Sequence, residues 1–189
     1  MARPRLPQGG PSLFDEDESE AAWQDVPAEA PAEAPGRGAF APSVRSQGRA
    51  LIVRADGGSR GNPGPAAYGA LVIDAVSGDV LNREGRTLGV ASNNVAEYSG
   101  LIAGLEMARA IDPAAVVEVR MDSKLVIEQM AGRWKIKHPD MKPLALRARG
   151  LCPASISWTW VPRAENKAAD ALVNGALDGS PVSRGAEGA

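Results

Sequence analysis

The sequence predicts an α/β protein with one mixed sheet, and three observations support this prediction. Short apolar runs rich in Val and Ile alternate with longer segments in which apolar residues recur every three or four positions, as in strands and helices respectively. The first three apolar runs are joined by short connections, which is typical of an antiparallel meander. The later runs are separated by helices, and such β-α-β connections favour parallel pairing. We therefore expect five strands, three antiparallel and then two parallel, flanked by helices.

The first half of the predicted domain contains three strands and a long helix. A β-branched run predicts a strand at residues 49–55. Two more strands are predicted within residues 66–89, on either side of a Ser-Gly-Asp turn. Apolar residues at helical spacing predict a helix over residues 93–111, with Asn93 or Asn94 as its cap. An Asp-Pro pair then ends this helix.

The second half alternates strands and helices. Strands are predicted at residues 115–122 and 155–162. Helices are predicted at residues 123–132, 138–151 and 166–179, and a glycine closes the first of them. The predicted order is therefore β-β-β-α-β-α-α-β-α.

Composition divides the chain into three parts. Residues 1–47 are rich in Pro, Ala and Gly and hold eight acids against four arginines without a regular apolar period, so we expect a disordered tail. Residues 48–178 form the expected domain, with sixteen Lys or Arg and fourteen Asp or Glu, and residues 179–189 form an expected disordered end. The whole chain has a net charge of −2, so the domain itself is mildly basic. Because both phenylalanines lie in the tail, the core must rely on aliphatic residues with a few Trp and Tyr.

Two charged segments bear on partners. Residues 132–150 hold six basic residues and one acid, which is either a phosphate-binding cluster or a solvated helix face. The acidic tail either competes with nucleic acid for this cluster or, through Leu13, Phe14 and Trp23, forms a short motif that binds a protein partner. No apolar run is long enough for a signal sequence or a membrane span. We therefore expect a cytoplasmic protein without membrane contact, and a monomer.

Four acidic residues fall at strand ends and helix starts. Asp56 and Asp122 end strands, whereas Glu97 and Asp170 lie near the starts of helices. In open α/β sheets such positions gather at one edge, where these sheets keep their sites. Taken alone, each acid would be an ion-pair partner or a helix-start residue. Together they would repel one another unless cations lay between them, and oxygen ligands without a His or Cys pair suit two Mg²⁺ ions, with Mn²⁺ as a substitute.

The stretch DGGSRGNPGP, which begins at Asp56, carries few bulky side chains. We expect a bent loop there, because glycine opens space and adopts φ angles that other residues avoid. Such a loop would let a polyanionic substrate approach two metal ions, the arrangement that stabilises in-line phosphoryl displacement.

Four blocks of the sequence resemble, in the correct order, the catalytic blocks of the ribonuclease HI family. They are DGGSRGNPGPAAYGA at 56–70, SNNVAEY at 92–98, MDSKLV at 121–126 and NKAADALVN at 166–174. The resemblance runs from about Arg49 to Leu177. It implies a ribonuclease H-like fold with a five-stranded sheet, and an endonuclease that hydrolyses the RNA strand of an RNA/DNA hybrid, leaving 5′-phosphate and 3′-hydroxyl ends.

The family pattern also implies a role for each acid. Asp56 would bridge two metal ions. Glu97 and Asp122 would hold the ion near the leaving 3′ oxygen, and Asp170 would help to hold the ion that activates the attacking water.

The resemblance further implies contacts with the substrate. Asn93 and Asn94 would touch the RNA 2′-hydroxyl, by which a protein distinguishes RNA from DNA, although helix capping is the alternative for both. Asn62 would contact the backbone and Ser92 a phosphate. Trp134 would lie along the DNA strand, or else belong to the core.

The chain departs from the family pattern in two places. The loop VPRAENKAAD lacks the histidine that many members carry, so Glu165 is a candidate replacement. The only histidine, His138, is expected at a helix start instead. The basic segment between the second and third helices is also short.

Two alternative functions therefore stay open. One is a nuclease of the same fold that prefers double-stranded RNA or RNA-DNA junctions, and the other is a noncatalytic hybrid-binding module. The four acids count against the module, because a binder of phosphates would do better without them. The sequence does not rank hybrid, double-stranded RNA and single embedded ribonucleotides.

Overall fold

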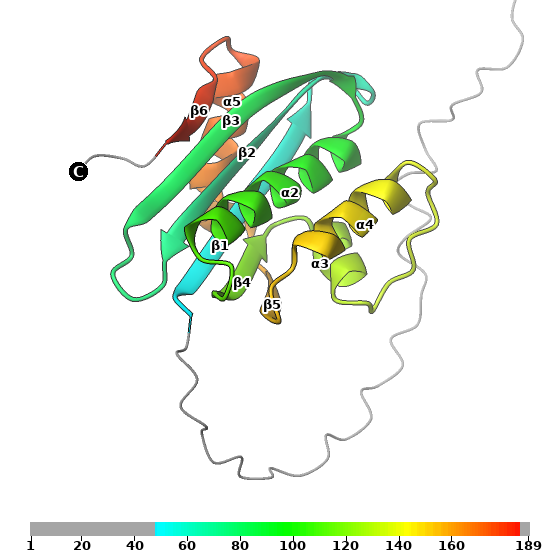
Figure 1. The fold of residues 1–189 in the computed structure, drawn as a ribbon. Helices are drawn as coiled ribbons and strands as arrows, with labels where there is room; N and C mark the ends of the chain where they lie inside the picture. The colour runs from blue at the N-terminus through cyan, green and yellow to red at the C-terminus, as the bar shows by residue number, and fades with distance from the viewer. Residues whose placement is uncertain (1–47, 186–189) are drawn as a thin grey trace, which may run out of the picture. The chain divides into compact units, whose positions relative to one another are not determined.

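The computed structural model describes residues 48–185, which form one six-stranded sheet with helices on both sides (Figure 1). The predicted tail at residues 1–47 and the last residues, 186–189, lie outside the described residues. The disorder of the tail and its binding of a protein partner therefore stay predictions. Within residues 48–185, no helix has the length and apolar character needed to cross a membrane.

The elements follow the predicted order, with two additions. The strands are β1 (Ala50–Ser59), β2 (Gly64–Asp74), β3 (Val80–Ala91), β4 (Val116–Met121), β5 (Ser155–Trp160) and β6 (Val182–Gly185). The helices are α2 (Asn93–Ile111), α3 (Lys124–Met130), α4 (Met141–Leu151), α5 (Lys167–Leu177) and the short 3-10 turn η1 (Arg163–Glu165). The additions are η1, between β5 and α5, and β6 after α5.

The sheet has the order β5-β4-β1-β2-β3-β6. Strands β1, β2 and β3 form the predicted antiparallel meander, and β4 and β5 pair in parallel with β1 and with each other. The mixed α/β class is therefore confirmed, but the predicted count of five strands is wrong. The sixth strand, β6, pairs antiparallel with β3 and lies inside residues 179–189, which we expected to be disordered.

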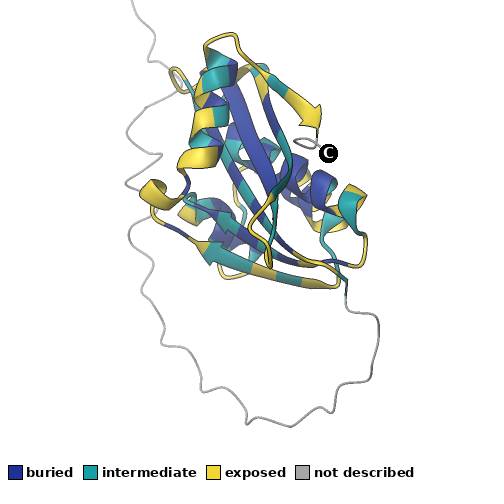
Figure 2. Ribbon diagram, turned by 90° about the vertical axis from the view of Figure 1, so that its left-hand side faces the viewer, coloured by how far each residue is buried: buried dark blue, intermediate teal, exposed yellow. Residues whose placement is uncertain are grey.

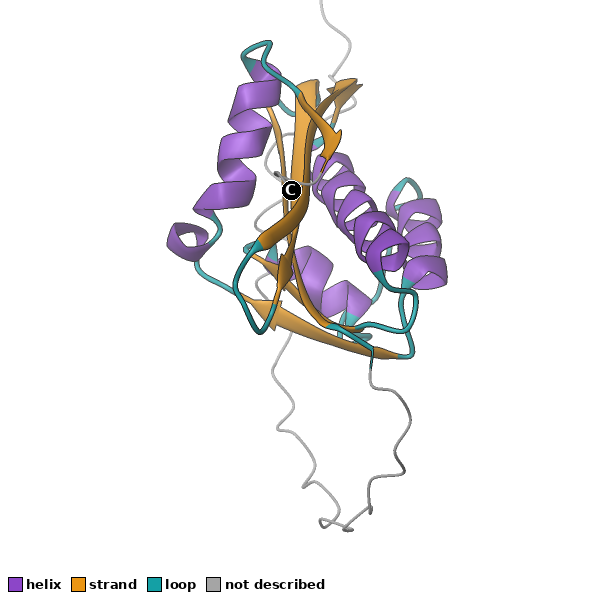
Figure 3. Cartoon of the chain, turned by 60° about the vertical axis from the view of Figure 1, so that its left-hand side comes forward, coloured by secondary structure: helices purple, strands orange, loops and turns teal. Residues whose placement is uncertain are grey.

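The helices divide between the two faces of the sheet (Figure 3). Helix α2 packs on β1 and β2 with α4 beside it, whereas α5 packs mainly on β2 and β3 from the other face. Burial is concentrated in the central strands and the inner sides of the helices (Figure 2). As predicted, the buried hydrophobic residues are aliphatic apart from Tyr68 and Tyr98.

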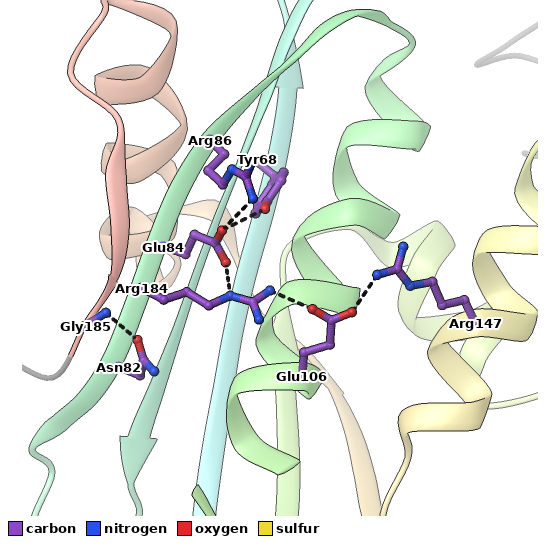
Figure 4. A network of polar contacts seen from close by, with 8 residues as sticks. All are labelled: Tyr68, Asn82, Glu84, Arg86, Glu106, Arg147, Arg184 and Gly185. Atoms are coloured by element: carbon purple, nitrogen blue, oxygen red, sulfur yellow. Dashed lines mark hydrogen bonds and ion pairs between the residues drawn. The ribbon is translucent and has the colours of Figure 1, made fainter. Parts of the chain in front are cut away.

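A chain of charged side chains attaches β6 to the rest of the domain (Figure 4). Arg184 of β6 donates to Glu84 of β3 and, at 2.6 Å, to Glu106 of α2. Glu106 also accepts from Arg147 of α4 at 2.6 Å. Glu84 is 2% exposed and accepts a further bond from the Tyr68 hydroxyl at 3.1 Å. A buried carboxylate requires such partners. The side chains that attach β6 are therefore charged ones, and β6 has no buried apolar face. For this reason the hydrophobic pattern of the sequence did not predict the strand.

Candidate active site

The strand that carries Asp56 is longer than predicted. We expected β1 to end at Asp56, but it runs to Ser59, and Gly57 pairs with Tyr68 of β2. A Cβ atom at Gly57 would lie 2.1 Å from the backbone nitrogen of Glu97. The expectation of an open glycine loop directly after Asp56 is therefore wrong. Because Gly57 has no side chain, the start of α2 packs directly against β1, and this packing brings Glu97 close to Asp56.

The start of α2 also differs from the prediction. Its N-cap is Ser92, whose hydroxyl accepts from the backbone nitrogen of Val95 at 3.4 Å. Asn93 and Asn94 are the first two helical residues and do not cap the helix. Ser is a favoured N-cap residue because its short hydroxyl reaches the free N–H groups of the first turn. The asparagine side chains are therefore not needed for capping.

The four predicted acids line one pocket of about 280 Å³ at one edge of the sheet. They come from β1, from α2, from the residue after β4 and from the first turn of α5. The polar residues of the pocket are Asp56, Ser59, Arg60, Asn93, Glu97, Asp122, Arg163, Asp170 and Asn174.

The pocket raises the pKa values of two of these acids, Asp56 and Glu97, and so disfavours their ionised forms. Burial, followed by the charge of Asp122, raises the pKa of Asp56 to about 6, although the N–H of Gly57 donates to Asp56 at 2.8 Å and opposes the rise. Burial raises the pKa of Glu97 to about 7 against a hydrogen bond from the Ser123 hydroxyl, and the charges of Asp56 and Asp122 add to the rise. Repulsion between partly buried acids is what a bound cation would relieve.

The other two acids are bonded to protein donors. The side-chain amide of Asn166 donates to Oδ1 of Asp122 at 2.7 Å. The Arg163 guanidinium donates to Oδ1 of Asp170 at 2.7 Å, and the Asn174 amide donates to its Oδ2 at 2.9 Å. Each acid of the pocket thus has a protein hydrogen-bond partner.

In the conformation described for residues 48–185, no three or more Asp, Glu, His or Cys side chains come close enough together to hold a metal ion. The donor set nevertheless fits a divalent cation, because four carboxylates line the same pocket and the pKa values of two are raised there. Asp56, Glu97, Asp122 and Asp170 are the residues that would hold it, in competition with their present partners.

The predicted substrate contacts fall into two groups. Asn93 lines the pocket, and its amide donates to Glu97 at 3.3 Å. Asn62 is exposed beside it, with Oδ1 accepting from the backbone nitrogen of Asn93 at 3.2 Å, and Asn94 is exposed on the next position of α2. Trp134 lies apart from these residues, in a groove of about 620 Å³ between α4 and the segment before it. The groove also contains Lys135, Lys142 and Arg149.

Sequence reasoning missed six polar residues of the site: Ser59, Arg60, Arg163 and Asn174 line the pocket, and Ser123 and Asn166 bond its acids. Ser123 directly follows Asp122, and Asn166 lies one helical turn before Asp170, so both spacings were visible in the sequence. Arg163 belongs to the loop that lacks the family's histidine, and its guanidinium bonds Asp170. Glu165, the predicted replacement for that histidine, does not line the pocket.

A mixed sheet with this strand order, with helices on both faces and four acids at one edge, defines the ribonuclease H-like class of α/β proteins. The reverse transcriptase-like family matches residues 54–176. The chain is 51% identical over 139 residues to a bifunctional protein of Mycobacterium tuberculosis, covering 72% of this chain and 38% of that one. It is 46% identical over 127 residues to ribonuclease HI of Halobacterium salinarum, covering 65% of this chain and 62% of that one. The chain thus spans well under half of its mycobacterial relative.

Solved structures agree with this class. The N-terminal RNase H domain of the M. tuberculosis protein has a TM-score of 0.67, at 51% identity over 70% of this chain and 96% of that one. RNase H1 of H. salinarum has a TM-score of 0.64, at 44% identity over 68% and 98%. LC11-RNase H1, solved with an RNA/DNA hybrid, has a TM-score of 0.65, at 38% identity over 69% and 98%. The chain belongs to the ribonuclease H family.

Proposed function

We propose that this protein is a metal-dependent endoribonuclease that hydrolyses the RNA strand of RNA/DNA hybrids, leaving 5′-phosphate and 3′-hydroxyl ends. The observation that carries the proposal is the gathering of Asp56, Glu97, Asp122 and Asp170 around one pocket. LC11-RNase H1, a relative at 38% identity, was solved with such a hybrid, which supports the choice of substrate. We further propose that the protein acts as a cytoplasmic monomer.

The four acids of the pocket would hold two Mg²⁺ ions. When bound, such ions polarise the phosphodiester and stabilise charge on the attacking and leaving oxygens. Asp56 and Glu97 would contribute carboxylates that are unfavourable without a cation. Asn93 and the exposed Asn94, at the start of α2, would contact the RNA strand. The basic groove around Trp134 would contact the opposite strand through its phosphates.

Removal of divalent metal should abolish cleavage without unfolding the protein. We expect hybrid cleavage with Mg²⁺ or Mn²⁺ and none with excess chelator, because the acids would then lack the cation that polarises the substrate. Gel analysis of an end-labelled hybrid measures cleavage, and circular dichroism in chelator controls for folding. Cleavage at full rate in chelator would refute the metal-dependent mechanism, whereas metal-dependent binding without cleavage would favour a noncatalytic module.

Substrate preference should follow the 2′-hydroxyl contacts. We expect cleavage of a hybrid, none of an all-DNA duplex, and a fall in hybrid cleavage of about tenfold, or roughly 1.4 kcal/mol, in Asn94→Ala. Asn94 is the better choice than Asn93 because the Asn93 amide also bonds Glu97. Asp79→Ala, in the exposed turn between β2 and β3, is the matched control. Rates on hybrid, double-stranded RNA and a duplex with one ribonucleotide should be compared, and faster cleavage of double-stranded RNA would favour the alternative nuclease.

A further inference from the structure

The side chain of Asn166 is fully buried between three elements that carry acids of the pocket. Its Nδ2 donates to the backbone carbonyl of Ala55 in β1 at 2.9 Å and to Oδ1 of Asp122 after β4 at 2.7 Å. Asn166 itself immediately precedes α5, which carries Asp170. One amide group therefore connects the residue before Asp56, the carboxylate of Asp122 and the helix of Asp170.

This placement comes at the expense of the helix that Asn166 begins. Asn is one of the best N-cap residues, and a side-chain cap contributes typically about 1 kcal/mol. Asn166 is the N-cap of α5 but makes no side-chain cap bond, and its amide donates to Asp122 and to the carbonyl of Ala55 instead. Its Oδ1 is buried and has no hydrogen-bond partner in the described residues. The stability of α5 therefore does not explain the position of this side chain.

The turn that carries Asn166 is tied to the same strand a second time. The Arg54 guanidinium donates to the backbone carbonyl of Glu165, one residue before Asn166. Arg54 and Ala55 are successive residues of β1, so the strand contacts the turn through a side-chain donor and a backbone acceptor. The same turn carries Arg163, which bonds Asp170.

We propose that Asn166 is a positioning residue of the carboxylate pocket, and that Arg54 holds the turn that presents it. Asn166 fixes one oxygen of Asp122, so that a cation would meet the other oxygen in one orientation relative to Asp56. Arg54 acts at a distance, since its bond is to the turn and to none of the four acids. This proposal rests on the proposed function, because it concerns the same metal-binding acids.

The test measures Mn²⁺ binding to the full chain by calorimetry, in Asn166→Ser and in Arg54→Met. Serine can cap α5 but is too short to reach Asp122, so the variant keeps the helix start and loses the contact. Loss of a residue that orients a metal ligand typically weakens metal affinity about 10–100-fold, and we expect a loss of Mn²⁺ affinity in this range for Asn166→Ser. For Arg54→Met, which acts through the turn, we expect a smaller loss of affinity, from a few-fold to about tenfold. The fold loss of Mn²⁺ affinity in the double variant should not exceed the product of the two single losses, because both residues fix one turn.

Asp140→Ala is the matched control. Asp140 is the N-cap of α4, is exposed, and likewise makes no side-chain cap bond. We expect its Mn²⁺ affinity to stay within about twofold of the wild type, since it contacts none of the pocket acids. Urea unfolding of every variant separates an effect on the pocket from a loss of folding. If Asn166→Ser does not fold, Arg54→Met carries the test with Asn166 intact.

A second readout separates positioning from hybrid binding. We expect kcat for a short hybrid to fall in Asn166→Ser while KM changes less than about threefold, because a fully buried residue has no surface to offer the substrate strands. Unchanged Mn²⁺ affinity in folded Asn166→Ser would overturn the positioning role, whether or not the wild type cleaves hybrids. A wild type that binds Mn²⁺ but does not cleave would instead overturn the proposed function, and the affinity comparison would still decide the role of Asn166.

Discussion

Asp56→Asn is expected to abolish hybrid cleavage and, in the absence of metal, to make the protein more stable. Asp56 lies on β1, one of the two central strands of the sheet, lines the pocket with the other three acids, and is partly buried. Asparagine keeps the oxygen that accepts the Gly57 N–H but removes the charge. We expect a loss of activity of about 10³-fold or more, because the pocket loses a charged metal ligand.

The gain in stability has the same cause as the loss of activity. Burial and the charge of Asp122 raise the pKa of Asp56 to about 6, so its ionised form destabilises the folded state at neutral pH. In chelator, we expect Asp56→Asn to raise the free energy of unfolding by about 1–2 kcal/mol at pH 7. The folded state binds the proton more tightly than the unfolded state, so the wild type becomes relatively more stable as the pH falls through 6. The difference should therefore shrink toward pH 4.

Urea unfolding in chelator and end-labelled cleavage assays measure the two effects. Asp79→Asn is the control, because Asp79 is exposed in the turn between β2 and β3 and does not line the pocket. It should change neither stability nor activity appreciably. Efficient cleavage by Asp56→Asn would mean that the pocket acids are not the catalytic ones, and a loss of stability in chelator would mean that ionised Asp56 does not destabilise the folded state.

Arg184→Met is expected to have the largest effect on stability. It keeps much of the side-chain stem but removes the charge that bonds Glu84 and Glu106 (Figure 4). Glu84 is 2% exposed and would retain the Tyr68 hydroxyl and Arg86, whose nitrogen lies 3.5 Å away. Glu84 is buried, so losing its shorter ion pair leaves its charge poorly compensated by these two partners, and we expect a loss of about 3 kcal/mol. For a domain of this size that corresponds to a fall in Tm of about 10 °C.

Arg147→Met is the matched control for Arg184→Met. Arg147 bonds the same Glu106, but its side chain is 62% exposed and does not contact Glu84. An exposed pair contributes about 1 kcal/mol or less, so thermal unfolding should show a much smaller shift. Glu84→Gln should recover part of the stability lost in Arg184→Met, since it removes the buried charge. Equal shifts in the two arginine variants would show that the burial of Glu84 does not determine the attachment of β6.

Local patterns in the sequence were sufficient for the order of the elements and for the four acids. Hydrophobic period and turn residues are properties of neighbouring positions, so they predicted the meander, the long helix and the later β-α-β portions. The acids were found because strand ends and helix starts meet at one edge of an α/β sheet. The structure places all four on one pocket, and the pocket is consistent with the roles proposed for them.

The remaining features depend on partners that lie far away in the sequence. Strand β1 continues past Asp56 because β2 pairs with its glycines, and Gly57 is required because α2 lies against it. Strand β6 forms although its own residues are mostly exposed, because Arg184 reaches acids about 80 to 100 positions earlier. Asn166 begins α5, yet its amide bonds Ala55 and Asp122, which lie more than 40 positions earlier. The sequence by itself determined which acids the site contains. Only the tertiary structure decided what holds them, because a hydrogen bond between distant residues leaves no periodic pattern in either segment.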